Sequence, residues 1–264
     1  MNLCTAANGS FYLQALNLFA SFRAFKPKDK IFLYYFDFTV DQLNAISSNI
    51  ANIEFIEVPQ ACPHIHEPTV FIYKTFALQD CIKKVDECLI YSDAAACFLR
   101  DPTDIINYFK DDRFFLPYNT PLLNNKYWTT KKTFELMEVD GAEDKPQYWA
   151  GFQGYQKSQK NIEFLHDLYS YMKNPEIALP NPSVERPDGA TATCVQHRGD
   201  QSVLSLLIHK HSLHQEFNEE KNDKYGDYQT QQLFNPNLQV NTKSIILSPR
   251  ESKNGAFRYL KTPA

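Results

Sequence analysis

The sequence lacks the features that mark membrane and secreted proteins. No apolar run is long enough to cross a bilayer. The first ten residues, MNLCTAANGS, do not combine a charged segment with a long apolar one, as a secretory signal would. The sequence therefore predicts a cytoplasmic protein without a transmembrane segment.

Paired cysteine motifs are also absent. The 6 cysteines form no CxxC pair, and most of them lie within apolar segments. Such cysteines are typical of buried thiols in a reducing compartment rather than of disulfides or a zinc site.

Positive charge is neither abundant nor clustered. The net charge is −4, and residues of both signs are spread along the chain. A nucleic-acid-binding protein would normally carry a basic face, and a protein held at a membrane surface would carry a basic amphipathic segment. Both classes are therefore disfavoured.

What the sequence does contain is an alternation of strand and helix patterns. Apolar runs at 3–7, 31–36, 53–58 and 88–92 indicate strands, and the stretches 11–25, 41–50 and 69–82 between them indicate helices. This order predicts an α/β fold with a mostly parallel sheet flanked by helices. Further strands are expected at 113–117 and 148–156, a helix at 200–211, and a late antiparallel strand at 244–248. The whole chain, 1–264, is interpreted as one domain.

The most informative stretch is 89–96, LIYSDAAA, in which an apolar strand ends at an acidic residue followed by small ones. Ligands of open α/β sheets bind outside the carboxyl ends of the strands. Asp93 could hold a divalent cation or a ribose hydroxyl there, while Ser92 and Ala95 let a diphosphate approach the backbone. Alternatively, Asp93 only caps the next turn.

Two later stretches carry similar signals. In 148–155, YWAGFQGY, a glycine such as Gly151 within a strand marks a bulge or a close approach of ligand to backbone, and Trp149 could stack on a sugar or belong to the core. In 197–202, HRGDQS, polar residues lead into an apolar helix. Asp200 could cap that helix, or its N-terminus could receive a sugar or phosphate with His197 beside it.

A turn at 249–255, PRESKNG, places Arg250 and Lys253 after the late strand. These two cations could cover a diphosphate, although most such turns are solvated surface.

Taken in order, these stretches resemble GT-A nucleotide-diphospho-sugar transferases, in particular galactosyltransferase-like and capsule- or viral-type members. Residues 5–8, TAAN, resemble the first strand that grips the nucleotide. Lys74, Ala77 and Leu78 match a K-x-x-A-L helix, and 91–95 lies where the family carries its DxD motif. Residues 149–154 with the following Lys-Ser resemble a G-G-F-x-G-x-x-K-S corner, and 200–205 resembles a D-Q-x-x-L helix.

The resemblance implies a transfer of sugar from a UDP- or GDP-type donor to a hydroxyl acceptor, such as a glycan, in polysaccharide or glycoconjugate synthesis. Residues 1–118 would form the nucleotide-binding half and 119–264 the acceptor-side half. The implied donor-binding residues are Thr5, Ala6, Asn8, Lys74, Ser92, Asp93, Ala95, Trp149, Gly151, His197, Arg250 and Lys253. Asp200 and Gln201 are the implied catalytic residues.

One departure concerns the metal. The resemblance implies Mn²⁺ or Mg²⁺ held by Asp93, but the second acid of the DxD motif is Ala95 here. A hard cation needs several oxygen ligands. Either His197 or Asp200 completes the set, or cations such as Lys74 and Arg250 replace the metal. A non-catalytic sugar-binding module and a sugar nucleotidyltransferase remain the alternative functions.

Overall fold

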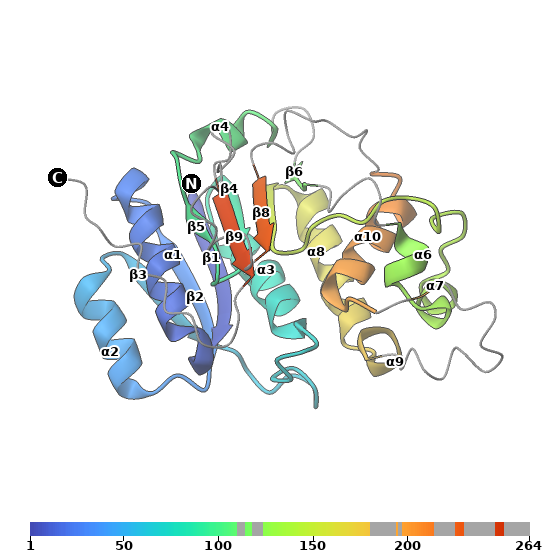
Figure 1. The fold of residues 1–264 in the computed structure, drawn as a ribbon, viewed down its shortest axis with the longest axis horizontal. Helices are drawn as coiled ribbons and strands as arrows, with labels where there is room; N and C mark the ends of the chain where they lie inside the picture. Colours follow the sequence, from blue (N-terminus) through green and yellow to red (C-terminus); the bar gives the residue numbers. More distant parts are fainter. Residues whose placement is uncertain are drawn as a thin grey trace.

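The computed structural model describes residues 1–109, 114–117, 124–179, 194 and 197–213, together with the backbone of 225–229 and 246–250. Helices and strands alternate along the first half of the chain, as the sequence predicts (Figure 1). Within the described residues, no helix is both long and apolar enough to cross a membrane. None of the 6 cysteines is in a disulfide.

The main sheet has six strands in the order β3-β2-β1-β4-β7-β6. Strands β1 to β4 pair in parallel, β7 runs antiparallel to β4, and β6 runs antiparallel to β7. The prediction of a mostly parallel sheet is confirmed. The strands are β1 Asn2–Asn8, β2 Ile31–Phe36, β3 Ile53–Glu57, β4 Cys88–Ser92, β6 Phe114–Phe115 and β7 Phe152–Gln156.

Alternating residues of β1 divide the core between the two faces of the sheet. Leu3 and Ala7 belong to one cluster of buried residues, whereas Cys4 and Ala6 belong to the other. This is the period of two that a strand buried on both faces requires. Helices α1 Tyr12–Phe25 and α2 Val40–Asn49 bury apolar residues in the first cluster. Helices α3 Ile72–Lys84, α8 Gln159–Met172 and α10 Asp200–Lys210 do so in the second.

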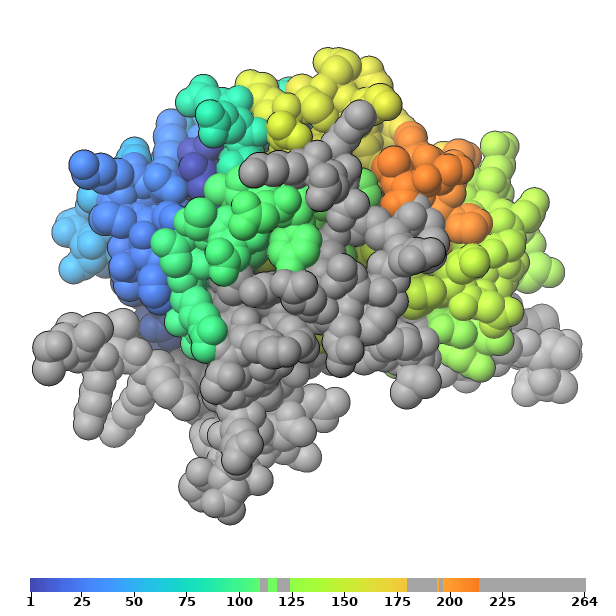
Figure 2. All heavy atoms as spheres, turned by 90° about the horizontal axis from the view of Figure 1, so that it is seen from above, coloured from blue at the N-terminus to red at the C-terminus, as the bar shows by residue number. Residues whose placement is uncertain are grey.

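Four short helices complete the described part: α4 Thr103–Ile106, α6 Asn125–Trp128, α7 Lys131–Met137 and α9 Pro175–Ala178. Helices α6, α7, α9 and α10 gather on the far side of α8 from β1 to β3 (Figure 1). A view from above gives the same separation, with blue to green N-terminal residues on one side and yellow-green to orange residues on the other (Figure 2).

Two helix starts differ from the prediction. The side chain of Asn8 caps a short 3-10 turn, η1 Gly9–Phe11, and α1 begins after it at Tyr12. Helix α3 begins after Phe71, whose φ is 62°, and so starts later than residue 69, where the sequence predicted it. The apolar periodicity located both helices but not their first residues.

A second, three-stranded sheet joins distant parts of the chain in the order β5-β9-β8. Strand β5 is Cys97–Phe98, β8 is Tyr225–Gln229 and β9 is Ile246–Arg250. Strand β9 pairs antiparallel with β5, so the late antiparallel strand is confirmed, two residues further along than predicted. This pairing places residues 246–250 beside β5, which follows β4 in the sequence.

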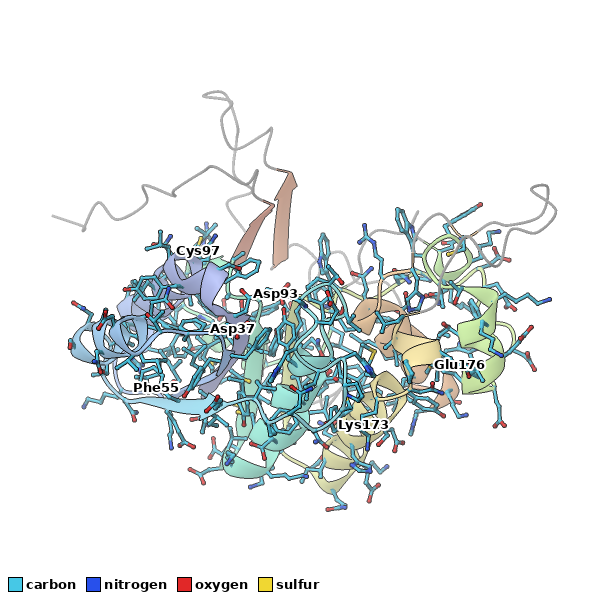
Figure 3. The ribbon with its side chains drawn as sticks, turned by 90° about the horizontal axis from the view of Figure 1, so that it is seen from below. Asp37, Phe55, Asp93, Cys97, Lys173 and Glu176 are labelled. Atoms are coloured by element: carbon cyan, nitrogen blue, oxygen red, sulfur yellow. The ribbon has the colours of Figure 1, made fainter. Side chains whose placement is uncertain are left out.

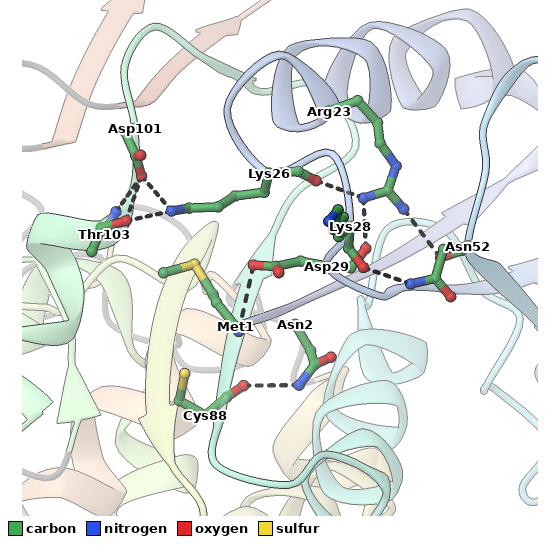
Figure 4. A network of polar contacts seen from close by, with 10 residues as sticks. All are labelled: Met1, Asn2, Arg23, Lys26, Lys28, Asp29, Asn52, Cys88, Asp101 and Thr103. Carbon is green, nitrogen blue, oxygen red and sulfur yellow. Dashed lines mark hydrogen bonds and ion pairs between the residues drawn. The ribbon is translucent and has the colours of Figure 1, made fainter.

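A guanidinium ties together the corner of the fold opposite the carboxyl ends of the strands. Arg23 donates to the backbone oxygens of Lys26 at 2.8 Å and Asp29 at 2.5 Å, and to those of Ala51 and Asn52 (Figure 4). The end of α1 and the entries to β2 and β3 are thereby held by one side chain. The N-terminal ammonium of Met1 pairs with Asp29 nearby, at 3.4 Å.

Candidate active site

The predicted site residues converge at the carboxyl ends of β1 and β4. Asn8 is the last residue of β1, and Asp93 directly follows β4. Because these neighbouring strands are parallel, both ends lie at one edge of the sheet, where open α/β folds bind ligands. Asp93 lies near the middle of the molecule (Figure 3).

Lys74 joins the two acids that sequence analysis singled out. Its Nζ lies 2.7 Å from Asp93 Oδ1 and 3.6 Å from Asp200 Oδ2. Lys74 comes from the first turn of α3, Asp93 from the end of β4 and Asp200 from the first turn of α10. Three elements far apart in sequence therefore meet at one ammonium group.

The charge of Lys74 is stabilised by its partners. Burial alone would lower its pKa, but the carboxylates of Asp200 and Asp93 outweigh that effect and hold the pKa above its usual value. The ring of Phe71 covers another side of the ammonium, with its centroid 4.3 Å from Nζ. Lys74 is therefore a charged, nearly enclosed ammonium.

Asp200 is a buried acid rather than a helix cap. The cap position belongs to Gly199, whose φ is 50° and where a Cβ would lie 3.0 Å from the backbone oxygen of Val70. Burial raises the pKa of Asp200 to about 6, with Asp93 adding to the rise and Lys74 opposing it. The capping interpretation was wrong, because the turn before α10 needs the conformational freedom of glycine.

Asp93 is held from several sides. Its backbone N–H donates to the oxygen of Gly151 at 2.8 Å, and the hydroxyl of Tyr91 donates to its Oδ1 at 3.2 Å. A Cβ on Gly151 would lie 2.9 Å from Oδ2. The close approach that the glycine predicted is therefore an approach to Asp93.

Gln201 lies in a chain of buried amides. Its Nε2 donates to Gln147 Oε1 at 2.6 Å, and Gln147 donates in turn to Thr129 Oγ1 at 3.1 Å. All three side chains are buried. The network joins the start of α10 to the segments around α6, and so sets where Asp200 stands.

The remaining predicted residues border this centre in different ways. Thr5 is fully buried, and its hydroxyl has no hydrogen-bond partner among the described residues; Ala6 and Ser92 are buried as well. Asn8 is 8% exposed and uses its side-chain oxygen on Ser10.

His197 and Trp149 have different surroundings. Burial lowers the pKa of His197 to about 4, against a smaller effect of the Ile177 backbone, so its ring is neutral at neutral pH and brings no positive charge. Trp149 is partly buried against the core cluster of α1, and its backbone N–H donates to the oxygen of Pro117. Arg198, next to His197, stacks its guanidinium 4.4 Å from the ring centroid of Trp128.

Arg250 lies within β9, not in the turn that the sequence predicted. Only its backbone is described, and Lys253 lies outside the described residues. Ala95, partly exposed, follows Asp93 in the turn that leads to β5.

Comparison with solved structures gives clear matches over most of the chain. A crystal structure of the galactosyltransferase LgtC with donor and acceptor sugar analogues matches with a TM-score of 0.56 and 12% identity over 94% of this chain and 87% of that one. An active-site mutant of LgtC matches with a TM-score of 0.51 and 12% identity, over 96% and 88%. The bifunctional glycosyltransferase WbbM matches with 0.55 and 7% identity, over 94% of this chain but 45% of that one. The chain has the GT-A glycosyltransferase fold. No protein-family model and no curated protein sequence matches it.

The resemblance implies a divalent cation, which needs ligand atoms from the residues around Asp93. A hard cation needs about six or more oxygen ligands, only some of which a donor and water could supply. Among the described residues, no group of three or more His, Cys, Asp or Glu side chains is placed to hold a metal ion. Asp93 already binds Lys74 and Tyr91, and Ala95 has no ligand atom. The described residues do not fit a metal site.

Two residues of the candidate site, Phe71 and Gln147, were not predicted from the sequence. Phe71, which packs on Lys74, adopts a left-handed backbone conformation. Glycine or asparagine usually indicates this conformation in a sequence, and phenylalanine does not. Gln147, which holds Gln201, lies in a polar stretch without periodicity. Neither position carries a local signal, because each acts through a contact with a distant element.

Proposed function

We propose that the chain is a glycosyltransferase that moves a sugar from a nucleotide-diphosphate donor, of the UDP or GDP type, to a hydroxyl acceptor in polysaccharide or glycoconjugate synthesis. The observation that carries the proposal is the ion-paired group of Lys74, Asp93 and Asp200 at the ligand-binding edge of a GT-A sheet. The LgtC structure that shares this fold holds donor and acceptor sugar analogues, which supports the same pair of ligand classes here.

Sugar transfer requires that negative charge on the diphosphate be stabilised and that the proton of the acceptor be removed. The bond between the anomeric carbon and the diphosphate oxygen breaks, and its electron pair goes to the diphosphate, where a cation stabilises the new charge. The acceptor oxygen bonds to the anomeric carbon and loses its proton. If the configuration inverts, Asp200 accepts that proton. If it is retained, Asp200 or Gln201 stabilises the positive sugar, and the departing diphosphate oxygen accepts the proton.

Residues 1–118 would bind the nucleotide and 119–264 would face the acceptor, within one domain. This assignment agrees with the position of Asn8 and Asp93 at the carboxyl ends of β1 and β4, and of Asp200 on α10. Binding of the donor without turnover at any acceptor would instead favour a non-catalytic module. The replacement of the second DxD acid by Ala95 is the feature that favours this alternative.

The test compares Asp93→Asn with Asp144→Asn, which removes an exposed carboxylate paired with Lys126 on the surface. We expect kcat/KM for donor hydrolysis and transfer to fall by about tenfold or more in the first variant, because it loses a charge that orients Lys74. The second variant should match the wild type. A thermal-shift panel of nucleotide sugars identifies the donor beforehand. Unchanged kinetics in Asp93→Asn would remove Asp93 from the site.

A further inference from the structure

We propose, building on the proposed function, that Lys74 takes the place of a divalent cation in this GT-A site, so that the nucleotide diphosphate binds and leaves without metal. The acids that would otherwise attract a metal ion are already neutralised by an ammonium of the chain itself. Two observations support this assignment, one for each acid of the pair.

The first observation is that Oδ1 of Asp93 is already occupied. It receives the ammonium of Lys74 at 2.7 Å and the hydroxyl of Tyr91 at 3.2 Å. A metal ion binds an oxygen at about 2.0–2.6 Å, so an ion at Oδ1 would have to displace the ammonium. Oδ2 remains, but Ala95 offers no second acid beside it, and a single carboxylate oxygen is far from the several oxygen ligands that a hard cation needs.

The second observation is that Oδ2 of Asp200 faces the same ammonium. It is buried, lies 3.6 Å from Lys74 Nζ and has no hydrogen-bond partner among the residues that the structure describes. With Phe71 over the ammonium, Lys74 is enclosed by two carboxylates and a ring. A divalent ion beside it would meet a fixed positive charge within a few ångströms, which is strongly unfavourable in a poorly solvated place.

The first experiment measures metal and nucleotide binding of the unaltered protein. Mn²⁺ alone is titrated into it and followed by the paramagnetic resonance of free Mn²⁺. UDP and GDP are titrated by calorimetry in EDTA and again in Mn²⁺. We expect no binding of Mn²⁺ to the protein and equal affinity for the preferred nucleotide under both conditions.

Nucleotide binding that disappears in EDTA and returns with Mn²⁺ would overturn the metal-free site while leaving the proposed transferase in place. If neither nucleotide binds under either condition, the donor site itself fails and the proposed function fails with it. The two failures are therefore distinguishable.

Two variants sharpen the result. Ala95→Asp supplies a second acid and Lys74→Met removes the competing ammonium, so the double variant should gain Mn²⁺ binding that the wild type lacks. Lys74→Met alone should weaken nucleotide binding in EDTA by about tenfold. Circular dichroism and thermal melts establish that each variant is folded. A folded Lys74→Met protein with wild-type affinity in EDTA, or a folded double variant that does not bind Mn²⁺, would contradict the assignment.

Discussion

At the scale of single residues, the centre of the molecule is a buried ammonium between two acids. Removing charges from water is costly, and buried ion pairs often stabilise a protein less than apolar residues of the same size would. Lys74, Asp93 and Asp200 occupy such a place. The backbone of Phe71, which covers the ammonium, has a φ of 62°, and a bulky residue in that region costs about 1–3 kcal/mol. An arrangement this costly to stability is typical of a functional site.

The state of Asp200 should govern the pH dependence of activity. Its pKa is raised to about 6. Asp200 must be ionised either to accept a proton or to stabilise a positive sugar. We therefore expect kcat/KM to rise with pH through about 6 and then to level off. Asp200→Asn should depress transfer, spare donor affinity and remove this rise; pH–rate profiles of both proteins provide the measurement. A profile that keeps the same limb in the variant would assign it to another group.

The same shift has a consequence for stability. The folded pKa of Asp200 lies above its ordinary value of 3.8, so the folded state binds the proton more tightly. As pH rises from about 4 to 6, Asp200 should lower the free energy of unfolding by at most about 3 kcal/mol. Urea unfolding of the ligand-free protein should show this fall in the wild type and lack it in Asp200→Asn. If the variant unfolds while activity per folded molecule persists, Asp200 is structural only.

At the scale of elements, two glycines have different tasks: Gly151 directly precedes β7, and Gly154 lies within it. A Cβ on Gly151 would meet Asp93, whereas a Cβ on Gly154 would lie 2.6 Å from the ring of Phe109. The first glycine leaves room for the site, and the second lets a core side chain pack on the sheet.

Alanine at each glycine should separate these tasks. Gly151→Ala forces Asp93 away from Lys74, and we expect donor affinity or kcat to fall by about tenfold with a modest change in stability. Gly154→Ala overpacks the core and should lower the free energy of unfolding by about 1–3 kcal/mol with kinetics retained. Calorimetric binding and urea unfolding measure the two effects. Equal effects of both substitutions on kinetics would show that Gly151 has no special relation to the site.

At the scale of the whole molecule, the corner held by Arg23 and the site lie at opposite ends of the parallel strands. Arg23 binds backbone oxygens before β2 and β3, while Asn8 and Asp93 lie at or just beyond the carboxyl ends of β1 and β4. Stability and function can therefore be changed separately.

Arg23→Gln should test this separation. We expect the free energy of unfolding to fall by about 2 kcal/mol, because hydrogen bonds from a charged donor to several carbonyl oxygens are lost. Nucleotide affinity should not change. Lys131→Gln is the matched control, since Lys131 is 85% exposed and its ion pair with Glu135 is long, at 3.8 Å. A marked loss of nucleotide affinity in Arg23→Gln would show that the two ends are coupled.

Much of the fold could be predicted because its signals are local. The apolar runs of β1, β2 and β4 and the periodicity of the helices between them depend on neighbouring residues alone. The acid after β4 also carried a local signal, since parallel strands place such a residue at the ligand-binding edge. Lys74 was recovered only through the resemblance to a family.

By itself the sequence determined the alternation of strands and helices, the parallel sheet and the edge at which Asp93 stands, because burial on both faces of a sheet leaves a periodic pattern. Only the tertiary structure decided that Lys74 lies between Asp93 and Asp200, that Gly199 rather than Asp200 begins the turn of α10, and that Gly151 packs on Asp93. These are contacts between residues separated by tens of positions, and their distances and charges exist only once the chain has folded.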